Sequence, residues 1–162
     1  MNKPFSRRRR RLSMVAGFVL FCAGLEQSFS AYEPLTPDDY TITEIADSLD
    51  HPWSLAFLPD GRLLVTERSG QLRIIDKGAV SEPVAGVPAV FSKSQGGLFD
   101  VVLHPGFDTN GWLYLSYAHG HDDANATRLA RARLEGNTLV DVTVLFTASP
   151  SKETPVHYGG RM

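Results

Sequence analysis

The chain has 162 residues, of which 43% are hydrophobic and 21% are charged, with 16 Lys and Arg against 18 Asp and Glu. This composition is typical of one globular domain. Six of the basic residues and one acidic residue lie in the first thirty positions, which leaves ten basic against seventeen acidic residues and a formal net charge of about −7. Because such a chain lacks the basic face that nucleic-acid binding requires, we expect no nucleic-acid partner.

Residues 1–30 are predicted to be a signal peptide. Lys3 and the arginines at 7–11 precede an apolar segment at 12–25, and small residues precede Ala31. This order is typical of a secretory signal, so we expect a periplasmic or secreted product. The apolar run is shorter than the roughly 20 residues of a spanning helix, and no permanent membrane span is expected. The arginine run fits a twin-arginine export signal, but a simple basic region explains it equally well.

Cys22 is the single cysteine of the sequence, and it lies within the predicted signal peptide. The mature chain would therefore have no thiol. A disulfide or a cysteine-ligated metal is not expected, although the predicted destination is oxidising.

Residues 52–76, PWSLAFLPDGRLLVTERSGQLRIID, are predicted to form an antiparallel meander. Three short alternating runs at 54–58, 62–67 and 71–75 are separated by turns rich in Pro, Asp, Ser and Gly. The preceding run at 40–46, YTITEIA, has the β-branched alternation of a further strand.

The same pattern recurs from Val101, where VVLHPGFDTNGWLYLSYA matches LAFLPDGRLLVTERS from Leu55. The short apolar run at 98–104 opens this second copy, and the runs at 127–134 and 139–146 continue it. A helix is possible at 127–134 because its Ala, Arg and Leu residues are good helix formers, but its short length and Gly-Asn ending favour a strand.

A repeat of about fifty residues built from short antiparallel strands is typical of β-propeller blades. The alternative is a chance match within an unrelated meander protein. We expect an all-β fold in which this chain supplies about two blades and the start of a third. Because a propeller has four to eight blades, residues 31–162 are interpreted as the N-terminal part of a longer, here truncated, propeller domain.

Two residues are candidates for a functional site. His157 precedes Tyr158 and two glycines, which places a titratable base on a tight turn that a ligand could approach closely. Gln95 precedes Gly96 and Gly97 at the end of a polar loop, where its amide could point into a central cavity. The residues alone leave open that each is an ordinary loop side chain.

Other polar and aromatic residues carry weaker signals. His119, His121 and the neighbouring aspartates lack a third ligand at suitable spacing, so we expect no metal site there. The aromatic residues Trp53, Trp112, Tyr114 and Tyr117 are interpreted as packing within the blades. The sequence contains no GxSxG motif, no Walker loop and no GxGxxG motif.

Taken together, these motifs resemble the soluble periplasmic PQQ-dependent sugar dehydrogenases, also described as the glucose/sorbosone or aldose sugar dehydrogenase family. The match runs through His51-Pro52-Trp53, residues 58–68 (LPDGRLLVTER), Gln95-Gly96-Gly97-Leu98, His104-Pro105 with Phe107, residues 110–114 (NGWLY), and His157-Tyr158-Gly159-Gly160-Arg161. It covers nearly all of the predicted mature chain.

The resemblance implies a six-bladed propeller that binds pyrroloquinoline quinone (PQQ) near its axis, with calcium holding the quinone. It implies that His157 is the general base that removes a sugar hydroxyl proton while hydride passes to the quinone, and that Gln95 lines the same pocket. The implied reaction oxidises aldose sugars to lactones and passes electrons to an external acceptor.

Two departures from the family limit this interpretation. An aspartate precedes the matching histidine in the glucose-specific members, whereas Val156 stands here, which favours broader aldose use. The quinone-binding basic residues and the calcium ligands of the family lie in later blades, so neither PQQ nor calcium is expected to bind this chain alone.

A non-catalytic binding module and an inactive gene fragment stay open as alternatives. A propeller lactonase is more distant, because its acidic metal ligands are not seen.

Overall fold

The computed structural model describes residues 34–162, so the predicted signal peptide lies outside the described residues. The described residues belong to two units, which divide between Thr41 and Ile42. The described part of the first unit contains one short 3-10 helix, η1 (Pro37–Asp39). Its first turn is tied by the backbone amide of Thr36, which donates to Asp39 Oδ2 across 2.7 Å.

The predicted strand at 40–46 is wrong. Residues 40–49 form no helix or strand, and the side chains of Ile42 and Ile45 are 86% and 59% exposed. A strand needs a partner for its backbone groups, and no described strand pairs with this segment. Alternation of β-branched residues was therefore not sufficient to predict the strand.

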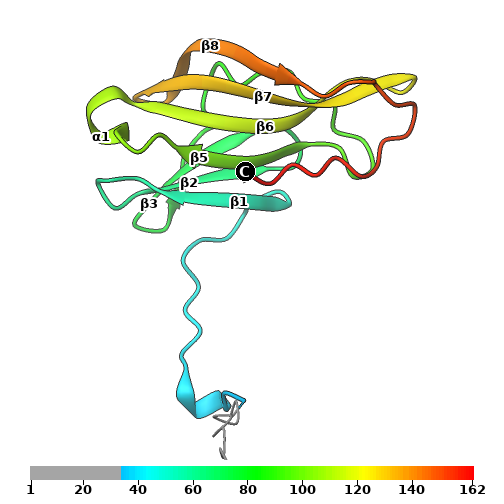
Figure 1. The fold of residues 1–162 in the computed structure, drawn as a ribbon. Coiled ribbons are helices and arrows are strands. Elements are labelled where there is room, and N and C mark those ends of the chain that lie inside the picture. The colour runs from blue at the N-terminus through cyan, green and yellow to red at the C-terminus, as the bar shows by residue number, and fades with distance from the viewer. Residues whose placement is uncertain (1–33) are drawn as a thin grey trace, which may run out of the picture. The chain divides into compact units, whose positions relative to one another are not determined.

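The second unit consists of two four-stranded antiparallel sheets (Figure 1). The first sheet has the order β1 (Pro52–Phe57), β2 (Leu63–Glu67), β3 (Leu72–Asp76) and β4 (Ala79–Val80). The second has the order β5 (Leu98–Leu103), β6 (Trp112–His121), β7 (Ala124–Glu135) and β8 (Thr138–Thr147), with the short helix α1 (Phe107–Asn110) between β5 and β6. The all-β prediction is confirmed.

The three strands predicted for the first meander are confirmed to within two residues at each end. The prediction missed β4, which pairs with β3 only through Ile75 with Val80 and Asp76 with Ala79. Two residues are too few to produce a periodic pattern. In the second sheet, residues 127–134 lie within the long strand β7, so the strand interpretation is confirmed and the helical alternative is wrong.

The main core combines side chains from both sheets. Leu64 and Leu72 of the first sheet and Leu98, Leu113 and Leu115 of the second are fully buried members of one cluster. Full burial of each of these leucines contributes about 1.5–3 kcal/mol. The two meanders therefore share one apolar core.

The connection between the sheets, residues 81–97, is held to both of them. The amide of Phe91 donates to Ala118 O across 2.8 Å, and the amide of Leu98 donates to Arg68 O across 3.2 Å. A Cβ at Gly97 would lie 2.4 Å from Arg68 O, so only glycine allows this approach. These contacts fix the loop that carries Gln95.

After β8 the chain returns along the second sheet and ends beside β5 (Figure 1). Lys152 forms a two-hydrogen-bond bridge with Asn125 of β7, and Thr127 Oγ1 donates to Tyr158 O across 2.7 Å. Ser116 Oγ of β6 donates to Gly160 O, and the amide of Met162 donates to Asp100 Oδ2 of β5 across 2.8 Å. The sheet thus positions the whole segment 152–162.

Within residues 34–162 no helix has the length and apolar character of a membrane span.

Candidate functional site

The structure brings His157 and Gln95 into direct contact. The backbone amide of His157 donates to Gln95 Oε1 across 2.9 Å, and the amide of Gln95 donates to Pro155 O across 3.1 Å. His157 has a φ of 58°, in the left-handed region that few side chains adopt. Both side chains are exposed. The contact joins a polar loop to the C-terminal segment.

A pocket of about 320 Å³ lies beside this contact. Its lining includes both predicted residues and is completed by Trp53, Phe99, Tyr158, Gly159, Gly160 and Arg161. The centroid of the Phe99 ring lies 5.8 Å from that of Trp53 and 5.4 Å from that of Tyr158, so the three side chains form a continuous aromatic row. The pocket therefore offers aromatic surface together with an imidazole, an amide and a guanidinium.

Trp53 differs from its predicted role. Tyr117 is 1% exposed and packs within the blade as expected, whereas Trp53 is 56% exposed and lines the pocket. The sequence pattern could not distinguish them because both occupy alternating strand positions. The position of β1 relative to β5 decides which side of β1 is covered.

The side chain of Tyr158 anchors the turn to β7. Its hydroxyl donates to Asn125 Oδ1 across 2.7 Å, and Asn125 is 1% exposed. Burial raises the pKa of the Tyr158 phenol. The tyrosine is thus held as a neutral hydrogen-bond donor directly after the candidate base.

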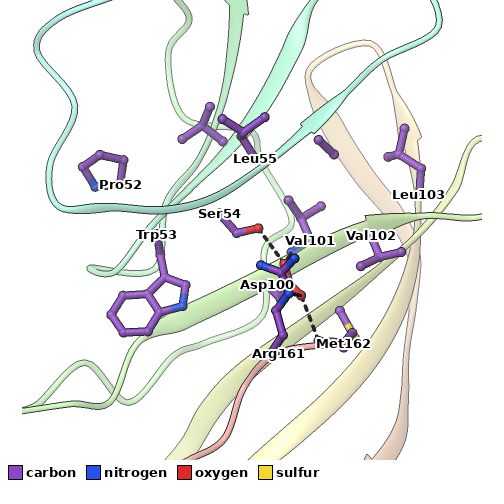
Figure 2. Close-up of a pocket in the computed structure, with 12 residues that line it drawn as sticks. Pro52, Trp53, Ser54, Leu55, Asp100, Val101, Val102, Leu103, Arg161 and Met162 are labelled. Atoms are coloured by element: carbon purple, nitrogen blue, oxygen red, sulfur yellow. Dashed lines mark hydrogen bonds and ion pairs between the residues drawn. The ribbon is translucent and has the colours of Figure 1, made fainter. Parts of the chain in front are cut away.

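A larger hollow of about 590 Å³ lies between β1, β5 and the end of the chain (Figure 2). Its polar centre is Asp100, which is 4% exposed and accepts hydrogen bonds from Ser54 Oγ at 2.5 Å and from the Met162 amide at 2.8 Å. Arg161 Nε lies 3.7 Å from Asp100 Oδ2. Because both carboxylate oxygens accept from protein groups, Asp100 serves as an anchor, and the smaller pocket with the imidazole is the better candidate site.

The histidines near the β6–β7 hairpin lie apart from this pocket. His119 and His121 are at the end of β6, and Asp122 of the turn forms a 2.7 Å ion pair with Lys93 Nζ. Burial lowers the pKa of His119, and the positive charge of Arg128 lowers it further. In the described part of the chain, no group of three or more His, Cys, Asp or Glu residues is placed to hold a metal ion.

Comparison with known proteins shows the family of this chain. A family model described as Glucose / Sorbosone dehydrogenase matches residues 49–162, more than two thirds of the chain. The chain belongs to this family. The resemblance inferred from the sequence motifs is confirmed, and the matched range contains every residue of both pockets.

The chain is also similar to several proteins with known names or structures. The aldose sugar dehydrogenase YliI of Escherichia coli is 40% identical over 131 residues, which are 78% of this chain and 35% of the relative. A crystal structure of a glucose dehydrogenase has a TM-score of 0.71 at 41% identity, over 75% of this chain and 37% of that chain. The PQQ-bound aldose sugar dehydrogenase of Streptomyces coelicolor has a TM-score of 0.60 at 26% identity, over 68% of this chain and 34% of that chain.

These structures confirm the fold prediction, because the two four-stranded sheets match part of glucose dehydrogenase propellers. The chain spans about a third of the length of the curated relatives that it matches, at 31% and 35%. The two sheets of the described residues therefore correspond to two blades of such a propeller.

Sequence reasoning missed residues that line the pocket or hold its turn. Phe99 of the lining reads as an ordinary apolar strand residue, and Lys152, which contacts the His157 turn without lining the pocket, reads as an isolated charge in a loop. Their positions at the site depend on the return of the C-terminal segment along the second sheet. Tyr158, Gly159, Gly160 and Arg161 carried a sequence signal, since they lie within the motif of His157, and Trp53 lies within the motif His51-Pro52-Trp53.

Proposed function

We propose that this chain supplies the proton-accepting part of the active site of a PQQ-dependent aldose dehydrogenase. The observation that carries the proposal is the exposed His157 imidazole on a turn that Gln95 holds, beside a pocket with an aromatic row. An imidazole accepts protons readily near neutral pH, and aromatic faces suit the apolar faces of sugar rings.

In the proposed reaction the anomeric hydroxyl of an aldose faces His157. The ring nitrogen of His157 takes the hydroxyl proton, the C1–H bond gives up its hydrogen as hydride, and the C1–O bond becomes the carbonyl of the lactone. PQQ, when bound, would supply the two-electron acceptor for this hydride. The protein groups orient the sugar and move the proton.

The described residues fit the quinone better than they fit calcium. The pocket has an aromatic row and a largely exposed guanidinium, Arg161, which suit a planar anionic ring system. In contrast, residues 34–162 contain no cluster of acidic or histidine donors that would hold a cation. We therefore assign no calcium ligand to these residues. Because the chain spans about a third of its relatives' length, we expect turnover to need the further blades of the family.

Gln95 is proposed to line the cofactor side of the pocket. Its Oε1 is engaged by the His157 amide, which leaves the Nε2 group for a ligand acceptor.

We also propose export to the periplasm or the medium through residues 1–30. N-terminal sequencing of the exported product should then begin at Ala31, and a product that keeps Met1 would contradict the export proposal.

A hybrid enzyme tests the catalytic proposal. Residues 49–162 would replace the matching segment of the aldose sugar dehydrogenase YliI of E. coli, and the hybrid would be loaded with PQQ and calcium. We expect it to reduce an artificial electron acceptor when given an aldose. In His157→Ala the kcat should fall by about 10²–10⁴-fold, whereas His121→Ala, a matched exposed histidine, should retain activity. Full activity of the His157→Ala hybrid would refute the assignment.

A further inference from the structure

The side chain of Lys152 folds onto the turn that carries His157. Its Nζ donates to the carbonyl oxygen of Val156 and, across 3.0 Å, to the carbonyl oxygen of His157. The same ammonium lies 3.8 Å from the centroid of the Tyr158 ring. One cation thus contacts three consecutive residues of the turn.

These contacts complement the one made by Gln95. The His157 peptide groups are held on both sides, with the N–H donated to Gln95 Oε1 at 2.9 Å and the C=O accepting from Lys152 Nζ. The left-handed backbone at His157 is disfavoured by about 1–2 kcal/mol for a residue with a side chain. Contacts from outside the turn must therefore offset this cost.

We propose that Lys152 is a positioning residue for His157, which holds the turn in its left-handed conformation so that the imidazole faces the pocket. The inference rests on the proposed function of His157 as the base. Lys152 itself lines neither of the two pockets beside β1. Its effect would therefore pass through the backbone of His157.

The ammonium can be removed without detaching the segment. The backbone of Lys152 exchanges two hydrogen bonds of 2.9 Å with the backbone of Asn125, and substitution of the side chain leaves both in place. The aliphatic stem of methionine can still cover Tyr158. Partial burial lowers the pKa of Lys152, which indicates that the cation is kept there at a cost.

The first test measures backbone order at His157 by ¹⁵N relaxation on the full chain, with no cofactor. We expect an order parameter of about 0.85 in the wild type, a fall to below about 0.6 in Lys152→Met, and a value near the wild type in Lys152→Arg. Lys77→Met, which removes an exposed lysine from the β3–β4 turn, should change nothing at His157. An unchanged order parameter in Lys152→Met would overturn the proposal. If that variant does not fold, Lys152→Gln takes its place.

The second test uses the hybrid enzyme. Because displacement of a catalytic group by about 1 Å can cost about 100-fold, Lys152→Met should lower kcat by about 10–100-fold with little change in KM, and Lys152→Arg should recover part of the loss. An active hybrid in which Lys152→Met keeps the wild-type kcat would overturn the proposal. An inactive wild-type hybrid would instead refute the proposed function, and the relaxation measurement would still decide the role of Lys152.

Discussion

The backbone amide of His157 donates a hydrogen bond to the side chain of Gln95 across 2.9 Å, although 62 positions separate the two residues in the sequence. The contact links the loop before β5 to the segment that returns after β8. It explains how an exposed histidine can occupy one defined position, since the residue is held by its backbone while its ring stays free for a substrate.

Replacement of Gln95 by alanine should loosen this link. The His157 amide would lose its acceptor, and because the site is exposed the cost should lie near the low end of about 0.5–1.5 kcal/mol. The kcat of the hybrid enzyme should fall by more than this small loss of folding free energy would cause, because the His157 turn would lose one of the contacts that hold it. Gln95→Glu keeps an oxygen acceptor at the same position but loses the Nε2 donor, so backbone order at His157, measured by ¹⁵N relaxation, is the matched readout. Equal order parameters at His157 in the alanine and glutamate variants would contradict the role of this hydrogen bond.

Asp100 and Ser54 should be energetically coupled. Ser54 Oγ donates to Asp100 Oδ1 across 2.5 Å, and Asp100 also accepts from the Met162 amide in a buried setting (Figure 2). Asp100→Ala should lower the free energy of unfolding by about 1.5–3 kcal/mol, because hydrogen bonds to a charged group are lost. Urea unfolding of both single variants and the double variant should give a coupling energy of about 0.5–3 kcal/mol. Strictly additive effects would show that the two residues act independently.

Gly160 should tolerate no larger residue. A Cβ at this position would lie 2.4–2.6 Å from three atoms of Phe99, which is 2% exposed and cannot move aside. Gly160→Ala should therefore destabilise the chain by about 1–3 kcal/mol through overpacking. Gly159→Asn is the control, because that position has open space and a φ of 61° that asparagine adopts readily. Thermal unfolding should rank Gly159→Asn well above Gly160→Ala, and the reverse order would contradict the packing argument.

Tyr158 should make stability depend on alkaline pH. Burial raises the pKa of its phenol, so the folded chain keeps the proton at pH values where the unfolded chain, with a pKa of about 10, has lost it. The contribution of Tyr158 to stability is therefore present below about pH 10 and decreases as the pH rises further.

The variant Tyr158→Phe separates this effect from others. At about pH 7 it should be less stable than the wild type by about 1–3 kcal/mol, because the buried oxygen of Asn125 loses its donor. Urea unfolding should show that this difference becomes smaller above about pH 10. Tyr40→Phe, at a position that is 50% exposed, should show no such convergence. A difference that grows with pH would contradict the direction of the pKa change.

Much of the fold could be predicted because each strand of the meanders carries its own pattern. Residues 54–58 and 62–67 alternate apolar and polar side chains between turn residues, and the same pattern returned after Val101. Two errors mark the limit of such patterns. Residues 40–46 alternate equally well but have no partner strand in the described chain, and β4 is too short to show any alternation.

Residue types and their spacing along the chain were enough to predict the all-β class, the family and the presence of an imidazole and an amide on two glycine-rich turns. The packing of the two sheets was needed to establish that Gln95 holds the His157 amide, that Lys152 holds its carbonyl and that Trp53 faces the pocket. Backbone groups far apart in the chain find partners only where packed sheets bring segments together. A local pattern contains no information about which distant group completes a hydrogen bond.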